Sequence, residues 1–253
     1  MTTARAPRPR LRSAGGRPRS NPRPLDGTAH DEILRAATTL FAEKGFASTT
    51  MSEIAAAAGL KQSSLYYYFN RKEQILQATF TVNRAPLEFI QRIGTGDDSP
   101  GVKLYRLLRF DTEQLCTAPC DVNEVERLAS VQPDQFDEFW VDRQALHDWV
   151  ERLLAEGIDA SQFIDLVVPL TALSLLSGDE GLQNWFRDQH NHRPGRAVFA
   201  FPAYDAATVA RHYAACSLRS ILRRPSDLVR IERRVAVLDA EEAEDAEGAD
   251  EPT

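Results

Sequence analysis

The chain has 253 residues, and because 43% of them are apolar it can bury a sizeable core in one large domain or in two smaller ones. No apolar run approaches the 18 residues of a membrane-spanning helix, and the positive N-terminus has no apolar segment behind it to form a secretory signal. Three cysteines are too few for a disulfide framework and fit a reducing compartment. We therefore expect a cytoplasmic protein without a membrane partner.

Charge is strongly separated along the chain, which the net charge of −7 conceals. Residues 1–25 contain seven arginines and no acid, whereas residues 239–253 contain eight acids and no base. Residues 1–75 carry 12 basic and 6 acidic side chains, a net charge of +6, and the remaining residues carry a net charge of −13. A basic end on an acidic body predicts a polyanion as the partner of that end alone.

The pattern between the two charged ends is helical, without the Asn-Gly turns that indicate β-hairpins. The predicted fold class is all-α. We expect four regions: a disordered basic arm over residues 1–25, a small helical domain over 26–75, a larger helical domain over 76–236 and a disordered acidic tail over 237–253.

Residues 50–69 have the pattern of two short helices around a tight turn. Thr50 and Glu53 have the spacing of a capping box, in which the Thr oxygen accepts an amide of the first turn and the Glu reaches back. Gly59 breaks this helix, and a second helix is expected over Gln62–Phe69. The arrangement is a helix-turn-helix, whose second helix reads DNA with the side chains that it exposes.

The second helix has one apolar and one polar face. Leu65, Tyr68 and Phe69 share a face that is expected to turn inward. The opposite face carries a cation, an amide, two hydroxyls and two phenols: Lys61, Gln62, Ser63, Ser64, Tyr66 and Tyr67. Gln can bind adenine, Ser several base edges and Tyr a phosphate oxygen. Lys72, in the first turn of the next helix, lies beside free amides at a positive helix end, which suits a phosphate.

The stretch ILRAATTLFAEKGFASTTMSEIAAAAGLKQSSLYYYFNRKEQI, from Ile33 to Ile75, resembles the DNA-binding domain of the TetR/AcrR family of transcriptional regulators. The most specific parts are LFAEKGF (Leu40–Phe46), T-x-x-x-IA-x-x-AG (Thr50–Gly59) and LYYYF-x-x-KE (Leu65–Glu73). The resemblance implies a homodimer that binds a palindromic operator as a repressor and is released by a small hydrophobic effector. The DNA contacts that it implies are Thr49, Thr50, Gln62, Ser63, Ser64, Tyr66, Tyr67 and Lys72.

The larger domain is expected to begin with a long helix from Arg71 to about Ile93, which Pro86 bends or ends early. The next helix, over about 101–116, is apolar on most sides, so it is expected to be buried. In the family such a helix usually borders the effector cavity, to which we assign Leu104, Leu108, Phe110 and Trp149; plain core packing is an equal alternative. Arg106 and Arg109 are expected to pair with a local acid, such as Asp111 or Glu113, in preference to an acidic effector.

The family's dimer interface is commonly a bundle of the last two long helices of each subunit, expected here at about 161–187 and 204–222. Leu170 and Leu173 lie on the first of them at helical spacing. Residues 188–203 are expected to form a loop that is longer than most connections.

Three other classes of function fit the sequence less well. The chain has no Gly-rich phosphate loop, no Gly-x-Ser-x-Gly elbow and no paired carboxylates in a recognisable setting, so we expect no enzyme and no cofactor. Cys116 with Cys120, and His190 with His192, have permissive metal-ligand spacing, but the pairs lie about 70 residues apart. An architectural DNA-binding protein would not require a long apolar C-terminal domain. The sequence therefore predicts a ligand-responsive repressor, cytoplasmic and associated with the nucleoid.

Overall fold

The computed structural model describes residues 29–79, 84–118, 122–131, 133–191 and 204–249. In these ranges the chain forms eleven α-helices, a short 3₁₀ helix and no strand, which confirms the predicted all-α class. The basic arm predicted over residues 1–25 lies outside the described residues.

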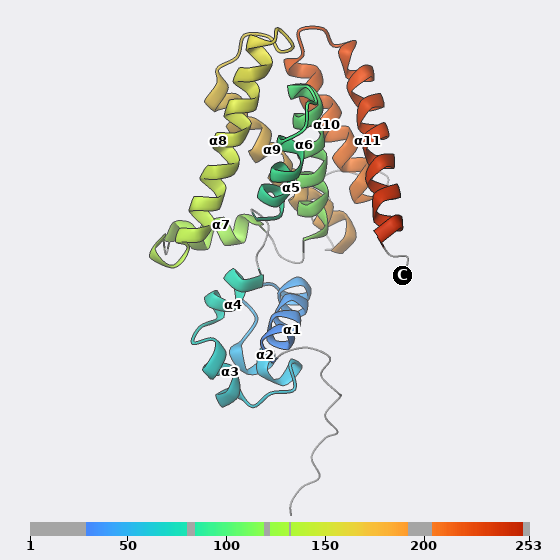
Figure 1. Ribbon diagram of the computed structural model, residues 1–253. Helices are drawn as coiled ribbons and strands as arrows, with labels where there is room; N and C mark the ends of the chain where they lie inside the picture. Colours follow the sequence, from blue (N-terminus) through green and yellow to red (C-terminus); the bar gives the residue numbers. More distant parts are fainter. Residues whose placement is uncertain (1–28, 80–83, 119–121, 132, 192–203, 250–253) are drawn as a thin grey trace, which may run out of the picture.

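The smaller domain, at the bottom of Figure 1, contains four helices: α1 (Ala29–Lys44), α2 (Met51–Ala57), α3 (Gln62–Tyr68) and α4 (Lys72–Thr79). Gly45 and Gly59 end α1 and α2 in the left-handed region, with φ of +81° and +70°, a conformation that favours glycine. Leu60 donates its amide to the Ala55 carbonyl at 2.8 Å and closes the end of α2. This turn places α3 across α2, as the sequence predicts.

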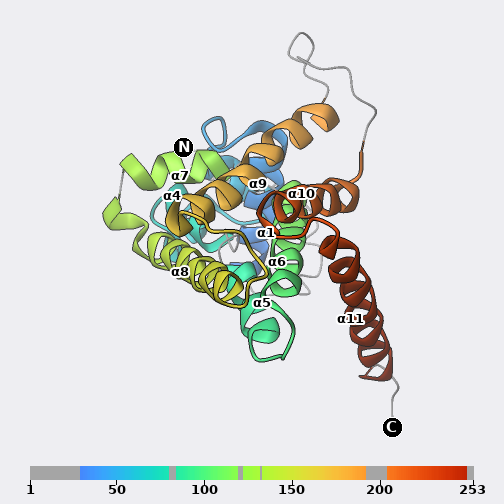
Figure 2. The ribbon, with the colours of Figure 1, turned by 90° about the horizontal axis from the view of Figure 1, so that it is seen from above.

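The larger domain is built around α6. Its helices are α5 (Arg84–Gly94), α6 (Pro100–Thr117), α7 (Val122–Val131), α8 (Asp137–Asp159), α9 (Val168–Asn191), α10 (Ala206–Ile221) and α11 (Asp227–Ala249), and a 3₁₀ helix at Pro133–Gln135 precedes α8. Figures 1 and 2 show α6 surrounded by the other long helices, and its Leu104, Leu107 and Leu108 are fully buried among them. The expected burial of this helix is confirmed.

Two features of the larger domain differ from the sequence prediction. The helix expected from Arg71 to Ile93 is two helices, since α4 ends at Thr79 and α5 begins at Arg84. Pro86 lies in the first turn of α5, where a proline has no intrahelical hydrogen bond to lose. The short helix α7 was not predicted, and α9 extends to Asn191, four residues into the predicted loop.

The acidic tail predicted to be disordered from residue 237 is helical up to Ala249, so this prediction was wrong. Asp239 accepts two hydrogen bonds of 2.6 Å from the guanidinium of Arg109, and Glu242 pairs with Arg106. The two acids lie three residues apart on one face of α11, so both turn toward α6. Charge pairing across the helices thus replaces the local partners that were expected for the two arginines.

Two carboxyl groups meet inside the core, Asp111 on α6 and Asp179 on α9. Burial raises the pKa of Asp111 to about 7, and the neighbouring Glu180 adds to the rise. Burial and the carboxylate of Asp111 together raise the pKa of Asp179 well above its usual range. Oδ1 of Asp179 accepts the Glu180 amide at 2.8 Å, whereas Oδ2 is buried without a hydrogen-bond partner. Ionising both groups therefore works against the packing of α6 on α9.

This pair predicts a pH-dependent stability. A carboxyl whose pKa is raised by folding stabilises the protein below its unfolded pKa, and the contribution is lost as pH rises through the folded value, here between about 4 and about 7. We expect Asp111→Asn to be more stable than the wild type at pH 8, by about 2–4 kcal/mol, and less dependent on pH across this window. Urea unfolding at a series of pH values measures both, with exposed Asp97→Asn as the control. A lower stability of Asp111→Asn at pH 8 would contradict the assignment.

Candidate DNA-binding surface

The first helix of the helix-turn-helix begins with the capping box that the sequence predicts. Thr50 Oγ1 accepts the Glu53 amide at 3.3 Å, and a Glu53 carboxylate oxygen accepts the Thr50 amide at 2.9 Å. The other carboxylate oxygen of Glu53 lies 2.5 Å from Nζ of Lys44. The hydrogen bond from Lys44, followed by those from Thr50, lowers the pKa of Glu53 to about 2. Thr50 is exposed and fixes the start of α2 at the surface.

Thr49, the other threonine assigned to DNA, is buried. Its side chain is 1% exposed, and its hydroxyl donates to the Gly45 carbonyl at 2.8 Å. This hydroxyl therefore holds the turn between α1 and α2 and is not available to a phosphate, which corrects its assignment as a side-chain contact. The resemblance alone did not distinguish two adjacent threonines that point in opposite directions.

Helix α3 presents most of the predicted polar face. Lys61, Gln62 and Ser63 are exposed and Ser64 is half-buried, while Leu65 is fully buried. Tyr67 is the most open of the aromatics, with 85% of its surface exposed, and Tyr66 is 44% exposed.

Tyr68 differs from the prediction that it packs inward, since it is 42% exposed and its ring lies edge-on to that of Tyr67 at 5.3 Å. Helix α3 ends at Tyr68, and the extended backbone of Phe69, with φ of −138° and ψ of 120°, turns the Phe69 ring into the core instead. The continuous helix assumed from the sequence ends one residue earlier. Helix α3 therefore exposes three phenols, an amide and short hydroxyls, and this chemistry suits base edges and phosphates.

Lys72 has a structural role that the sequence did not predict. Its ammonium donates to the carbonyls of Phe46 at 2.6 Å and Thr49 at 2.8 Å, and it lies 4.2 Å from the centre of the Phe46 ring. These contacts fasten the start of α4 to the turn between α1 and α2. Lys72 is thus a positioning residue for the helix-turn-helix, and a phosphate contact would compete with these carbonyls.

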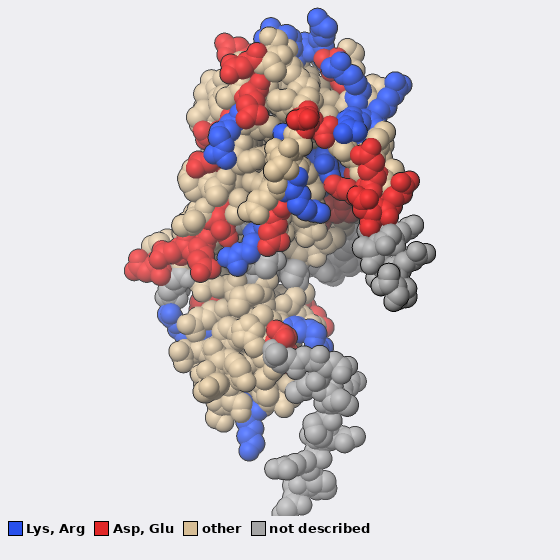
Figure 3. All heavy atoms as spheres, viewed as in Figure 1, with Lys and Arg blue, Asp and Glu red and all other residues tan. Residues whose placement is uncertain are grey.

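The small domain has little charge of its own to attract DNA. Residues 29–79 carry five basic and five acidic side chains, and the face of this domain that is visible in Figure 3 is largely uncharged. Arg35 pairs with Glu32 and Lys44 with Glu53. Among the described residues of this domain, only Lys61 and Arg71 are cations outside such contacts. The seven arginines of residues 1–25 therefore carry more net positive charge than the whole described domain.

The core of the small domain continues into the larger one. Val125, Leu128 and Ala129 on α7, with Phe136 at the start of α8, lie in one apolar cluster with side chains from α1 to α4. This cluster fixes the direction in which α3 points relative to the larger domain.

The four residues assigned to an effector cavity lie in or against the core. Leu104 and Leu108 are fully buried, and the Phe110 ring stacks on Phe89 with centres 4.3 Å apart. Trp149 is half-buried against the same cluster. Among the described residues, two cavities between α9 and α10 and one at the start of α11 are not lined by any of these four residues. One cavity, of about 630 Å³ between α9 and α10, has an almost wholly apolar lining that includes Leu182, Trp185 and Val209.

The described residues contain no group of three or more His, Cys, Asp or Glu side chains placed to hold a metal ion. Cys120 and His192, two of the four ligands considered from the sequence, lie outside them. The helices described here include none with the length and apolar character needed to cross a membrane.

Comparison with known proteins agrees with this geometry. A model of the tetR family of bacterial regulatory proteins matches residues 33–79. The HTH-type transcriptional repressor KstR2 of Mycolicibacterium smegmatis is 33% identical over 149 residues, which are 55% of this chain and 70% of KstR2. The chain belongs to the TetR family. It is therefore a transcriptional regulator and not an enzyme, as the sequence predicts.

Other transcriptional regulators also match this chain. The IcaR negative regulator of the biofilm operon of Staphylococcus epidermidis is 44% identical over 45 residues, 18% of this chain and 24% of IcaR. The solved structure of the ketosteroid transcriptional regulator KstR2 of Mycobacterium tuberculosis has a TM-score of 0.63 and 25% identity, and covers 78% of this chain and 96% of that one.

The contribution to stability of the hydrogen bonds from Lys72 to the turn between α1 and α2 can be tested directly. Lys72→Met removes hydrogen bonds from a charged group to two carbonyls, and we expect it to lower the free energy of unfolding by about 2 kcal/mol. Lys61→Met removes the same charge from an exposed site and should change it by less than about 0.5 kcal/mol. Urea unfolding of the two full-length variants measures the difference. Equal free energies of unfolding in the two variants would show that the hydrogen bonds of Lys72 do not stabilise the fold.

Proposed function

We propose that this TetR regulator is a repressor that binds a palindromic operator as a homodimer and is released by a small hydrophobic effector. The exposed face of α3 is the main support for operator binding, because its phenols and amide face solvent and are not buried in the core. The proposed contacts are Thr50, Lys61, Gln62, Ser63, Ser64, Tyr66 and Tyr67. A DNA-bound regulator places the protein with the nucleoid in the cytoplasm.

If α3 reads the operator, substitutions on its exposed face should lower the affinity for operator DNA. Gln62→Ala removes a bidentate base contact, so we expect a cost of about 1–3 kcal/mol on the operator and little change on random DNA. Tyr67→Ala removes a phosphate contact and should weaken both. Titration against an operator selected from a random library measures these affinities, with exposed Gln91→Ala as a control in the larger domain. Wild-type affinity in both variants would exclude this face of α3.

The arm is proposed to supply the phosphate attraction that the neutral small domain lacks. Each phosphate neutralised adds about 0.9 to the slope of log affinity against log salt. If two to four of the seven arginines take part, deleting residues 1–24 flattens that slope by roughly 2–4 units, on operator and random DNA alike. A loss that is larger on A·T-rich flanks would indicate minor-groove contact instead. An unchanged slope would show that the small domain binds DNA without help from the arm.

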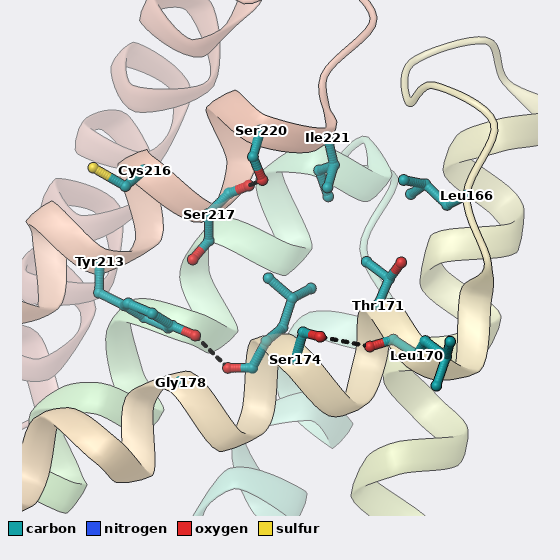
Figure 4. A pocket seen from close by; sticks show the side chains of 11 residues that line it. Leu166, Leu170, Thr171, Ser174, Gly178, Tyr213, Cys216, Ser217, Ser220 and Ile221 are labelled. Atoms are coloured by element: carbon teal, nitrogen blue, oxygen red, sulfur yellow. Dashed lines mark hydrogen bonds between the residues drawn. The ribbon is translucent and has the colours of Figure 1, made fainter.

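The dimer is proposed to form through α9 and α10. Leu170 on α9 is 61% exposed, and Leu173 on the same helix and Val167 just before it are 49% and 65% exposed. Leu170 lines a groove of about 580 Å³ between α9 and α10, shown in Figure 4. Gly178 allows α9 to approach Tyr213 of α10 closely, because a side chain there would meet the Tyr213 hydroxyl, which donates to the Leu175 carbonyl. An exposed apolar face of this kind suits a second copy of itself.

A charge placed in this face is expected to separate the subunits. Leu170→Glu and Leu173→Glu should raise the dimer dissociation constant by about 100-fold or more, because association would bury an unpaired carboxylate. Val141→Glu, at a site on α8 that is equally exposed, should leave the dimer intact. Light scattering over a concentration series measures the mass. A stable dimer in both leucine variants would place the interface elsewhere.

The effector is proposed to bind in the apolar cavity between α9 and α10. Its volume of about 630 Å³ lies within the range of ligand sites, and Trp185 and Tyr204 line it as aromatic walls. Thr208 and His212 are its polar groups. It shares Tyr213 and Cys216 with the dimer groove, so a ligand there would touch the helices that join the subunits. The ketosteroid regulator among the solved relatives makes steroid-like molecules a first choice of ligand.

A screen can decide between this cavity and the residues assigned from the sequence. In thermal-shift assays with ketosteroids, hydrophobic acids and acyl thioesters, a true ligand at 100 times its dissociation constant adds about 2.7 kcal/mol of stability. Val209→Trp fills the cavity and should abolish the shift, while Phe110→Leu, on α6, should retain it. If Val209→Trp retains the shift and Phe110→Leu abolishes it, the effector binds in the core around α6 instead.

A further inference from the structure

A polar cavity of about 390 Å³ lies at the end of the larger domain farthest from the DNA-binding surface. Lys and Arg side chains gather at this end of the molecule in Figure 3. Arg223 and Arg224, from the segment between α10 and α11, and Arg230, from α11, line the cavity. The remaining lining residues are Ser99, Pro100, Ala160, Ser161, Gln162 and Asp227.

The walls of this cavity are fastened together by Gln162. Its side chain accepts the Gly101 amide at 2.9 Å and donates to the Ser99 hydroxyl at 3.2 Å, which ties it to the start of α6. The backbone carbonyl of Gln162 accepts the Arg223 amide at 2.9 Å, and the adjacent residues Phe163 and Leu222 form an antiparallel bridge. Three segments that are distant in the sequence are thus held in fixed positions around the cavity, so the site is formed before any ligand arrives.

The charge of the cavity is not balanced by the protein. Some arginines on α6 and α11 have close carboxylate partners: Arg109 has Asp239, and Arg234 has Asp98 at 2.7 Å. Among the described residues, Arg223 and Arg224 have no carboxylate within salt-bridge distance, and Arg230 has only Asp227, 3.7 Å away. The chain has 37 acids for 30 basic residues, so acids are not scarce.

The backbone adds to this imbalance. Helices α6 and α11, of 18 and 23 residues, both begin at the rim of the cavity with their positive ends. Arg223, Arg224 and Arg230 are all exposed, and beside two such ends they repel one another and the helix termini. An anion in the cavity would remove this repulsion and accept hydrogen bonds from the guanidinium groups.

We propose that this cavity is a binding site for a phosphate-bearing small molecule, whose phosphate is held by Arg223, Arg224 and Arg230. The planar guanidinium groups match phosphate oxygens in pairs, and the serine hydroxyls of the rim offer further donors. A phosphate fills only part of about 390 Å³, so the ligand has an organic part as well. The site lies apart from the apolar cavity between α9 and α10 and does not depend on the effector proposed there.

The probe is sodium pyrophosphate, titrated calorimetrically into the full-length protein, with sodium chloride at equal ionic strength as the blank. We expect saturable binding to the wild type. The double variant Arg223→Gln, Arg224→Gln should raise the dissociation constant about tenfold or more, because two charge-assisted contacts are lost. Arg233→Gln removes a charge from α11 outside the cavity and should stay within about twofold of the wild type. Deleting residues 1–24 should leave binding unchanged, which separates this site from the arm.

Stability without ligand gives a second readout. The double variant should melt at a higher temperature than the wild type when no anion is present, since it relieves the repulsion between the arginines. If it does not fold, Arg230→Gln replaces it in both measurements. Three results would overturn the proposal: no saturable binding to the wild type, equal losses in the double variant and in Arg233→Gln, or tighter binding of sodium succinate than of pyrophosphate, which would indicate a carboxylate site.

Discussion

The position of α3 depends on one apolar contact, that between the small domain and α7. Val125, Leu128 and Ala129 complete a cluster that α1 to α4 cannot close alone, and Phe136 seals it from the start of α8. Because interiors of this kind are closely packed, α3 cannot turn relative to the larger domain without disturbing these side chains. A dimer that reads two half-sites needs a fixed distance between its two reading helices, and this contact supplies the rigidity on which that distance depends.

Helix α6 organises the larger domain in a similar way. A helix buried on most sides must match each of its polar groups with one from a neighbour, so these groups determine where the neighbours lie. Arg106 and Arg109 hold the end of α11, and Asp111 faces Asp179 on α9. Gln183 of α9 donates to the Leu115 carbonyl at 2.8 Å and accepts the Val122 amide at 2.9 Å. The amide side chain thereby connects the end of α6 to the start of α7, and so to the helix that carries the small domain.

The sequence predicts this fold best where the signal is local. The spacing of Thr50 and Glu53 and the glycine at position 59 act within a few residues, and the helix-turn-helix follows from them with boundaries within one residue of those expected. Thr49 and Lys72 were placed incorrectly or incompletely because their partners lie on other segments of the domain. Tyr68 was placed incorrectly because a single extended residue after it changes which ring turns inward.

The larger errors concern contacts between distant segments. The acids after residue 237 look like a solvated tail until the arginines of α6, about 130 residues earlier, are placed beside them. In the same way, no pattern in the chain indicates that the residues before α6, those after α8 and those before α11 form one basic cavity. The sequence thus indicates the candidate DNA-binding surface. It indicates neither the basic cavity nor the apolar cavity between α9 and α10.

The two ends of α11 are held to the body of the protein by different forces. Near the start of α11, Leu228, Ile231 and Val235 are buried in the main core. Closer to its C-terminal end, α11 is held by ion pairs with Arg106 and Arg109 of α6. Figure 2 shows the C-terminal end of α11 pointing away from the other helices. Salt screens partly exposed pairs but leaves apolar contacts nearly intact. The helix is therefore anchored at one end and detachable at the other. The ionic strength of the medium would set how much of its length lies on α6 and how often the guanidinium of Arg106, otherwise covered, meets solvent.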